Sequence, residues 1–137
     1  MRKAMIYLDA NIFLYALTSE DRKAENSKAI ITQVAEGDVE GCTSVLTWDE
    51  VLYVLIKEKG KKEAIIEIKK LLKIPKLIFI DANSDIINNA LNIVENYSLN
   101  PRDAIHAATA IINKCDKIAS DDSDFDKIKE LKRIKIN

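Results

Sequence analysis

The sequence predicts an α/β protein with three layers, α/β/α, built around a mostly parallel central sheet of about five strands. Short apolar runs of β type alternate along the chain with longer segments whose apolar residues recur every three or four positions. Strands separated by helices pair in parallel, and the connecting helices cover both faces of the sheet. With 137 residues and 47% hydrophobic content, the chain has the size of one domain with its own core. We expect a single domain over residues 1–137.

The expected strands are short and apolar, and they cover residues 4–9, 42–45, 77–80, 117–119 and 133–136. The expected helices have an apolar face, and they cover residues 22–36, 47–58, 61–73, 84–98 and 102–114. The last of these helices differs from the others because apolar residues surround it on all sides. It is therefore predicted to be buried.

The composition limits the class of protein. A net charge of −1 argues against unassisted binding of nucleic acid, although bound cations would change the local charge. No apolar run approaches the length of a membrane span, and Asp9 and Asn11 interrupt the N-terminal apolar stretch before it resembles a signal peptide. A cytosolic protein is expected. Cys42 and Cys115 are too few for a zinc motif and are expected to be buried, reduced thiols.

Acidic residues stand near the junctions between short β-type runs and helix starts. They are Asp9, Glu50, Asp103 and the cluster at 121–124. Because chemistry in an open α/β sheet collects at the carboxyl ends of the strands, we expect the carboxyls of the first three and of an acid of this cluster within roughly 10 Å of one another. Two carboxylates about 4 Å apart repel by roughly 4 kcal/mol at an effective dielectric near 20. Mg²⁺ or Mn²⁺ is the natural counter-ion for such oxygen ligands, so the pattern predicts a divalent-metal site.

Each acid also has a purely structural explanation as part of a helix cap. Thr47 and Glu50 fit a capping box, with Thr47 as the N-cap. The other helix starts have candidate caps of the same kind, namely Asp9 for a helix at Ala10, Asn100 with Pro101 before Asp103, and Ser120 or Asp121 for a turn leading to Phe125. Capping explains the acids singly. It does not predict four acids at the same end of one sheet.

Four motifs combine these acids with their neighbours, and they are Tyr7-Leu8-Asp9-Ala10-Asn11, Thr47-Trp48-Asp49-Glu50-Val51, Asp103-Ala104-Ile105-His106-Ala107-Ala108-Thr109-Ala110 and Ser120-Asp121-Asp122-Ser123-Asp124-Phe125. In this order and spacing the motifs resemble those of the PIN domain family, particularly the toxin nucleases of VapBC-type toxin–antitoxin pairs. The resemblance runs from about residue 4 to 136. It implies a PIN-like nuclease domain and a metal-dependent endoribonuclease that hydrolyses RNA phosphodiester bonds with Mg²⁺ or Mn²⁺.

The resemblance also implies roles for individual residues and partners. The implied catalytic, metal-binding acids are Asp9, Glu50, Asp103 and Asp122, with Asp124 as a fifth candidate ligand and Asn11 and Ser120 as supporting polar groups. His106 lies one residue off the face that carries Asp103, has no evident partner and is expected to be structural. Arg102 and nearby lysines are candidates for binding phosphate. The implied partners are an RNA substrate, a VapB-like antitoxin and a second copy of the chain in a homodimer.

Two alternatives stay open on the sequence. One is a housekeeping PIN nuclease that processes RNA. The other is a non-catalytic module, either a degenerate PIN domain or a receiver-like domain. A receiver would need paired acids after the first strand and an Asp after the third, where Asp81 stands, but Asp9 has no adjacent acid. Asn11 breaks the Asp-x-Asp pattern of an aspartyl-nucleophile phosphatase.

An apolar run at residues 51–56 lies on a predicted helix and cannot hide every side chain on one face. Either this helix is wholly buried beneath the helix at 61–73, or it forms a homodimer surface, an antitoxin-binding groove or both. We expect a dimer in solution, with part of the 47–73 region in the interface or exposed as an apolar patch.

Overall fold

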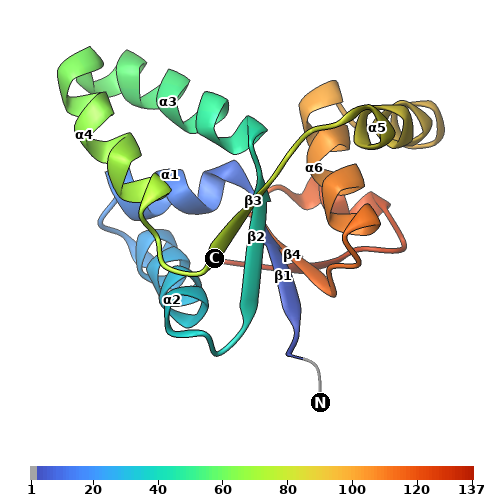
Figure 1. The fold of residues 1–137 in the computed structure, drawn as a ribbon, viewed down its shortest axis with the longest axis horizontal. Coiled ribbons are helices and arrows are strands. Elements are labelled where there is room, and N and C mark those ends of the chain that lie inside the picture. Colours follow the sequence, from blue (N-terminus) through green and yellow to red (C-terminus); the bar gives the residue numbers. More distant parts are fainter. Residues whose placement is uncertain (1–2) are drawn as a thin grey trace.

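The computed structural model describes residues 3–137 and shows a five-stranded sheet between two layers of helices (Figure 1). The strands are β1 (Met5–Leu8), β2 (Glu40–Ser44), β3 (Leu77–Ile80), β4 (Lys117–Ala119) and β5 (Lys132–Ile134). The helices are α1 (Ala10–Thr18), α2 (Arg22–Glu36), α3 (Leu46–Lys59), α4 (Lys61–Leu72), α5 (Ser84–Asn96), α6 (Pro101–Ile112) and a short 3₁₀ helix (Ser123–Lys127). The predicted three-layer α/β/α architecture is confirmed. Every strand pair is parallel.

Side chains of the central strand alternate between two cores. Ile6 and Leu8 of β1 pack with α1 to α4 on one face of the sheet, while Tyr7 packs with α5 and α6 on the other. Figure 1 shows α1 to α4 on one side of the strands and α5 and α6 on the other. Both cores are filled by apolar side chains, so each face of the sheet is covered and the parallel strands are buried.

The order of the strands is β3-β2-β1-β4-β5, which places the topological switch point between β1 and β4. The chain leaves β1 toward α1 on one face, and it returns to β4 from α6 on the other face. Such a switch point opens a crevice at the carboxyl ends of its two strands. The backbone N–H of Asp9 donates to the carbonyl of Ala119 at 3.0 Å, so the ends of β1 and β4 lie side by side. This strand order also removes the receiver-like alternative, whose order would be 2-1-3-4-5.

Helix α1 lies outside the predicted helical ranges, and only its start was indicated, by Asp9 as a candidate cap for a helix at Ala10. It follows β1 after a single residue, so its apolar residues read as a continuation of the strand. Ile12 and Phe13 are buried in the core, and the side chain of Asp9 caps the helix. Three strands also differ from the predicted ranges, because β1 covers only Met5–Leu8, β2 begins at Glu40, and β5 ends at Ile134. The burial predicted for α6 is confirmed for the middle of the helix, but not for its first two residues or for its last residue, Ile112, which is 38% exposed.

A close approach between α2 and β2 depends on a glycine. A Cβ atom at Gly41 would lie 2.4 Å from Cγ2 of Val34, which no real contact allows. Gly37 ends α2 in the left-handed region, with φ of 81°, and begins the turn into β2.

Helix α3 is partly buried and partly exposed. Val51 and Leu55 are buried, whereas Tyr53 is 65% exposed and Ile56 is also exposed. The alternative of a wholly buried helix is therefore wrong, and an exposed apolar surface in the 47–73 region is confirmed. Among residues 3–137, no helix is long and apolar enough to cross a membrane.

Candidate metal centre

Three carboxylates meet beside the carboxyl ends of the strands. Asp103 comes from the first turn of α6, and Asp122 and Asp124 come from the segment after β4. One oxygen from each lies within 4.8 Å of the other two. Burial and the negative charges of Asp122 and Asp9 raise the pKa of Asp103 to about 7. A hard divalent cation would relieve this crowding, and an all-oxygen donor set suits it.

Asp9 is held by three hydrogen bonds. Its Oδ1 accepts from the backbone N–H of Ala10 at 2.8 Å. Its Oδ2 accepts from the hydroxyl of Ser120 at 2.7 Å and from the amide of Asn11 at 3.2 Å. Burial raises the pKa of Asp9, although His106 and the bonds from Ser120 and from the backbone of Ala10 act in the opposite direction. The carboxylate is thus oriented by the two residues that the sequence suggested as supporting groups.

Glu50 enters the site from α3 and is hydrogen-bonded to Nε2 of His106. The same nitrogen lies 3.6 Å from Oδ1 of Asp9. On the other side of the ring, Nδ1 is hydrogen-bonded to the hydroxyl of Tyr7, which accepts from the backbone N–H of Ser44 at 3.1 Å. Burial disfavours a charged imidazole, but the bond to Glu50 and the charge of Asp9 give His106 a raised pKa. The absence of a partner for His106, inferred from the sequence, is wrong.

The capping box predicted for α3 is also wrong. The helix begins at Leu46 with Val45 as its N-cap, a residue without a side-chain oxygen. The hydroxyl of Thr47 is instead hydrogen-bonded to that of Thr43 at 2.6 Å. Glu50 is therefore not used at the end of its own helix, and its carboxylate turns to His106.

The cap predicted for α6 is confirmed. Oδ1 of Asn100 accepts from the backbone N–H of Asp103 at 2.9 Å, and the amide of Asn100 donates to Oδ2 of Asp103 at 2.9 Å. Pro101 follows as the first residue of the helix. Asp103 therefore takes part in both the cap and the acidic cluster.

The acids after β4 have different neighbours. Oδ2 of Asp121 accepts from the hydroxyl of Tyr15 at 2.7 Å and from Nζ of Lys23 at 2.9 Å, so its charge is already paired. Asp122 caps the 3₁₀ helix through a bond from the backbone N–H two residues on, at 2.9 Å. The cap is thus neither of the two residues predicted for it, Ser120 and Asp121.

Arg133 of β5 supports this segment and was not recognised in the sequence. It forms two bonds to Asp126, at 2.9 and 3.1 Å, and donates to the carbonyl of Ser120 at 3.0 Å. Asp126 and Ser120 lie before β5, in other segments of the chain than Arg133, so no short sequence motif identifies these contacts. Near the cluster, Nζ of Lys127 lies 3.2 Å from Oδ1 of Asp124.

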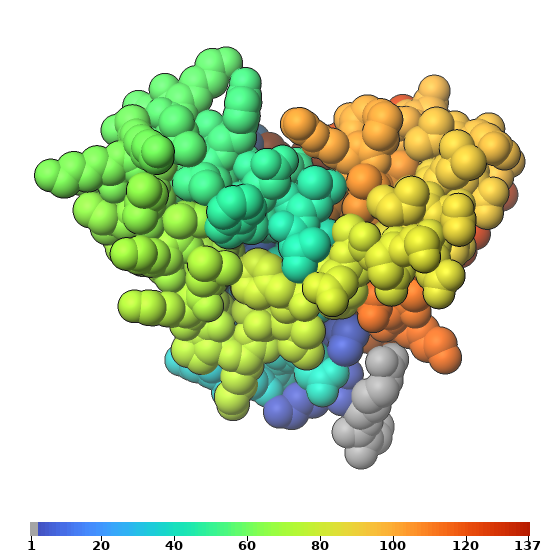
Figure 2. Space-filling view, turned by 45° about the horizontal axis from the view of Figure 1, so that its top comes forward, coloured from blue at the N-terminus to red at the C-terminus, as the bar shows by residue number. Residues whose placement is uncertain are grey.

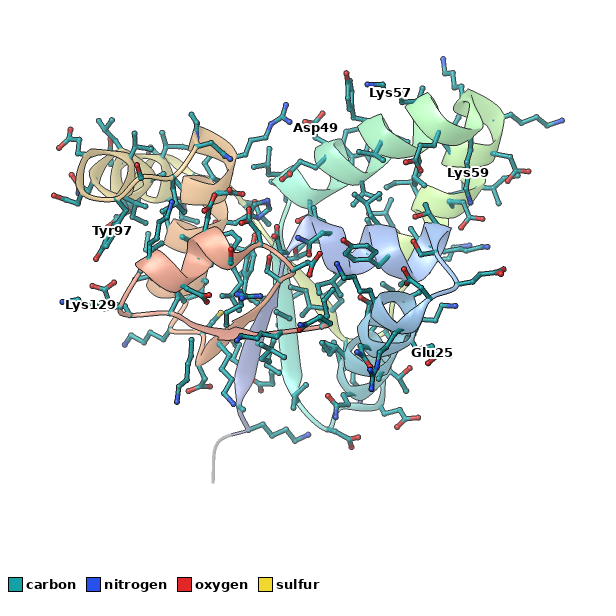
Figure 3. All side chains as sticks on the ribbon, turned by 180° about the vertical axis from the view of Figure 1, so that it is seen from behind. Glu25, Asp49, Lys57, Lys59, Tyr97 and Lys129 are labelled. Carbon is teal, nitrogen blue, oxygen red and sulfur yellow. The ribbon has the colours of Figure 1, made fainter. Side chains whose placement is uncertain are left out.

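The groups of the site come from both layers of helices. Figure 3 shows side-chain oxygen atoms gathered where the starts of α1, α3 and α6 converge. In Figure 2, the surfaces of α3 and α6 stand on either side of a hollow. The fold and the site define a class of protein, a parallel α/β domain with carboxylates from distant segments collected at its switch point.

Comparisons with known proteins identify the family. The model of the PIN domain family matches residues 6–131. Ribonuclease VapC2 of Methanocaldococcus jannaschii is 30% identical over 149 aligned residues, which cover 99% of this chain and 97% of that protein. The chain therefore belongs to the PIN domain family. Within this family it is a homologue of the VapC ribonucleases.

Solved structures agree on the fold. VapBC2 from Rickettsia felis, bound to a DNA fragment from its promoter, matches with a TM-score of 0.79 and 17% identity, over 97% of this chain and 99% of that chain. DNA-bound VapBC from Salmonella typhimurium matches with a TM-score of 0.77 and 15% identity, over the full length of both chains. These similarities extend over the whole α/β/α architecture.

Proposed function

We propose that this protein is a metal-dependent endoribonuclease, the toxin of a VapBC-type toxin–antitoxin pair, and that residues 1–137 form one nuclease domain acting in the cytosol. The substrate is RNA, and the reaction is hydrolysis of a phosphodiester bond. One observation carries the proposal. Carboxylate oxygens of Asp103, Asp122 and Asp124 lie within 4.8 Å of one another in a PIN domain chain that is similar to a ribonuclease over nearly its whole length.

The proposed catalytic acids hold a Mg²⁺ or Mn²⁺ ion, directly or through water. They are Asp9, Glu50, Asp103 and Asp122, with Asp124 as a fifth ligand. Carboxylate oxygens favour these hard cations over softer metals. The raised pKa of Asp103 supports the assignment, because burial and the nearby charges of Asp122 and Asp9 both disfavour its ionised form, and a bound cation would favour it.

Once bound, such an ion lowers the pKa of a bound water and neutralises charge that develops on the phosphate oxygens. The residues of this chain orient the carboxylates. Ser120 and Asn11 hold Asp9, and no nucleophilic side chain is required. Arg102, exposed on the first turn of α6 beside Asp103, is the proposed phosphate-binding group.

Apolar surface supports the proposed protein partners, a VapB-like antitoxin and a second copy of the chain. Large apolar side chains are exposed on α3 and α4 and just before α3, namely Val45, Trp48, Tyr53, Ile56, Ile65, Ile66 and Leu72. A separate cavity of about 330 Å³ opens between α1, α2 and α4, and its walls include Phe13, Leu17, Ile31 and Leu71. We propose that apolar residues of the antitoxin fill this cavity and that the α3–α4 surface contributes to the dimer.

Cleavage of RNA by the purified protein tests the nuclease proposal. Cleavage is expected with Mg²⁺ or Mn²⁺ and is expected to stop with EDTA. Asp122→Asn is expected to lower the cleavage rate by roughly 10-fold or more. Asp121→Asn, one position earlier, serves as the matched control. Cleavage that persists in EDTA would contradict the metal-dependent mechanism.

Expression in a host cell tests the toxin role separately. Growth arrest is expected with the wild-type protein and not with Asp122→Asn. Coexpression of the small gene next to the toxin gene is expected to restore growth. A protein that cleaves RNA in the test tube but never arrests growth would point to housekeeping RNA processing instead.

A further inference from the structure

We propose that His106, held in place by Tyr7, is a positioning residue that fixes the carboxylate of Glu50 for metal binding. The inference rests on the proposed function, because it assumes that Glu50 is a ligand of the ion. It goes further by assigning a task to two buried residues outside the set of acids.

The geometry links the two rings to the site. One ring nitrogen of His106 is bonded to Glu50, and the other is bonded to the hydroxyl of Tyr7. The rings meet edge to face, with centroids 5.6 Å apart and planes at 62°. Both side chains are fully buried, so neither ring has room to turn away.

One proton of His106 has the same place in both charge states of the ring. An ionised carboxylate only accepts hydrogen bonds, so Nε2 must carry the proton that faces Glu50. In the neutral ring, Nδ1 then accepts from the hydroxyl of Tyr7. The oxygen of that hydroxyl in turn accepts from the backbone N–H of Ser44 at 3.1 Å. The backbone of β2 thereby fixes the direction in which His106 presents its N–H group.

This N–H group faces two of the proposed ligands together. Nε2 is bonded to Glu50 and lies 3.6 Å from Oδ1 of Asp9. Without it, repulsion from Asp9 would favour rotamers that carry the long side chain of Glu50 toward solvent. The site would then contain fewer correctly placed oxygens. Partners that orient a ligating carboxylate contribute to metal affinity without touching the metal.

A purely structural network would also bury these groups with their hydrogen bonds satisfied. That alternative predicts a loss of stability when the network is broken, but no change in metal affinity. Binding of Mn²⁺ to the protein without RNA, measured by titration calorimetry, separates the two. Thermal melting of each variant without metal records its stability alone.

The variants differ in which hydrogen bond they keep. His106→Leu removes both ring nitrogens and is expected to weaken Mn²⁺ binding about 10- to 100-fold. His106→Gln keeps an N–H donor near the position of Nε2 and is expected to recover part of this loss. Tyr7→Phe keeps the ring but not the hydroxyl, and a loss of about 2- to 10-fold is expected. Thr109→Val is the control, since Thr109 is buried one turn along α6 and bonds only within its own helix, to the carbonyl of Ile105 at 2.6 Å.

The outcomes distinguish the inference from the proposed function. A wild-type protein that binds no Mn²⁺ would overturn the proposed function itself. Wild-type affinity in all the His106 and Tyr7 variants would overturn the positioning role alone. Equal affinity of His106→Gln and His106→Leu would overturn it too, because the donor would then not matter. If His106→Leu fails to fold, the comparison of His106→Gln and Tyr7→Phe with Thr109→Val decides the question.

Discussion

Replacing Asp103 with Asn is expected to stabilise the metal-free protein while removing its affinity for the ion. Burial and the charges of Asp122 and Asp9 raise the pKa of Asp103 from 3.8 to about 7. This difference corresponds to at most about 4 kcal/mol of unfavourable free energy in the folded protein. Because the carboxyl is only half buried, solvent screening reduces the value to about 1 to 2 kcal/mol. Asn has no charge and keeps an oxygen that accepts from the amide of Asn100.

The sign of the effect follows from the direction of the pKa change. A carboxyl whose pKa is raised on folding stabilises the protein while it is protonated, below pH 3.8, and this contribution is lost as the pH rises through about 7. The Asp103→Asn variant has no carboxyl at this position, so it does not lose this stability as the pH rises. In EDTA the variant is therefore expected to melt about 3 to 8 °C higher than the wild type at pH 8, with little difference near pH 4.

Circular dichroism melts at the two pH values, with EDTA or with Mn²⁺, measure both effects. Mn²⁺ is expected to raise the melting temperature of the wild type but not of Asp103→Asn. Asp85→Asn is the matched control, because Asp85 lies in the first turn of α5, is exposed and is not part of the acidic cluster. A metal-free Asp103→Asn protein that melts below the wild type at pH 8 would refute the reasoning and indicate that Asp103 acts mainly at its helix end.

Three further outcomes are expected. Asp121→Asn should retain most of the RNA cleavage rate, whereas Asp122→Asn should lower that rate roughly 10-fold or more. A larger loss in Asp121→Asn than in Asp122→Asn would show that Asp121 is the ligand instead. Gly41→Ala should lower the free energy of unfolding by about 1 to 3 kcal/mol in urea melts, because the new Cβ would lie 2.4 Å from a carbon of α2, and an unchanged midpoint would contradict that contact. The thiols of Cys42 and Cys115 lie 3.4 Å apart, and their hydrogen bond and burial raise the pKa of Cys42. Both thiols should therefore resist a thiol reagent in the folded protein at pH 8 and react once it is unfolded, so that rapid labelling of the native state would disprove their burial.

Most of the architecture could be predicted from the sequence because strands and helices differ in their apolar period. The extent of helix α1 could not, although Asp9 indicated its start, since the helix follows β1 after one residue and shares its apolar character. The capping box predicted for α3 was wrong for a different reason. Thr47 and Glu50 have the spacing of a capping box, but their side chains bond to Thr43 and to the distant His106 instead of to the backbone of the helix end. Local motifs cannot reveal such competition.

The residues of the site also fall into those that the sequence reveals and those that it does not. The acids could be found from the sequence because each stands in a short motif at a strand or helix end. The role of His106 could not, because its partners Tyr7 and Glu50 lie 99 and 56 residues away along the chain. Arg133 likewise supports the segment after β4 from a separate strand. Long-range hydrogen bonds of this kind leave no pattern in the order of residues.

The pairing of β1 with β4 has a consequence for when the protein can act. Asp9 and Ser120 are bonded although they lie 111 positions apart along the chain, and the proposed ligands are spread from Asp9 to Asp124. A ribosome that has completed β1 to β3 has produced Asp9 and Glu50, but not Asp103 or Asp122. Such a nascent chain carries only two of the five proposed ligands and lacks β4, the strand that brings them together. A harmful enzyme with this strand order therefore stays inert throughout most of its own synthesis and becomes active only as folding is completed.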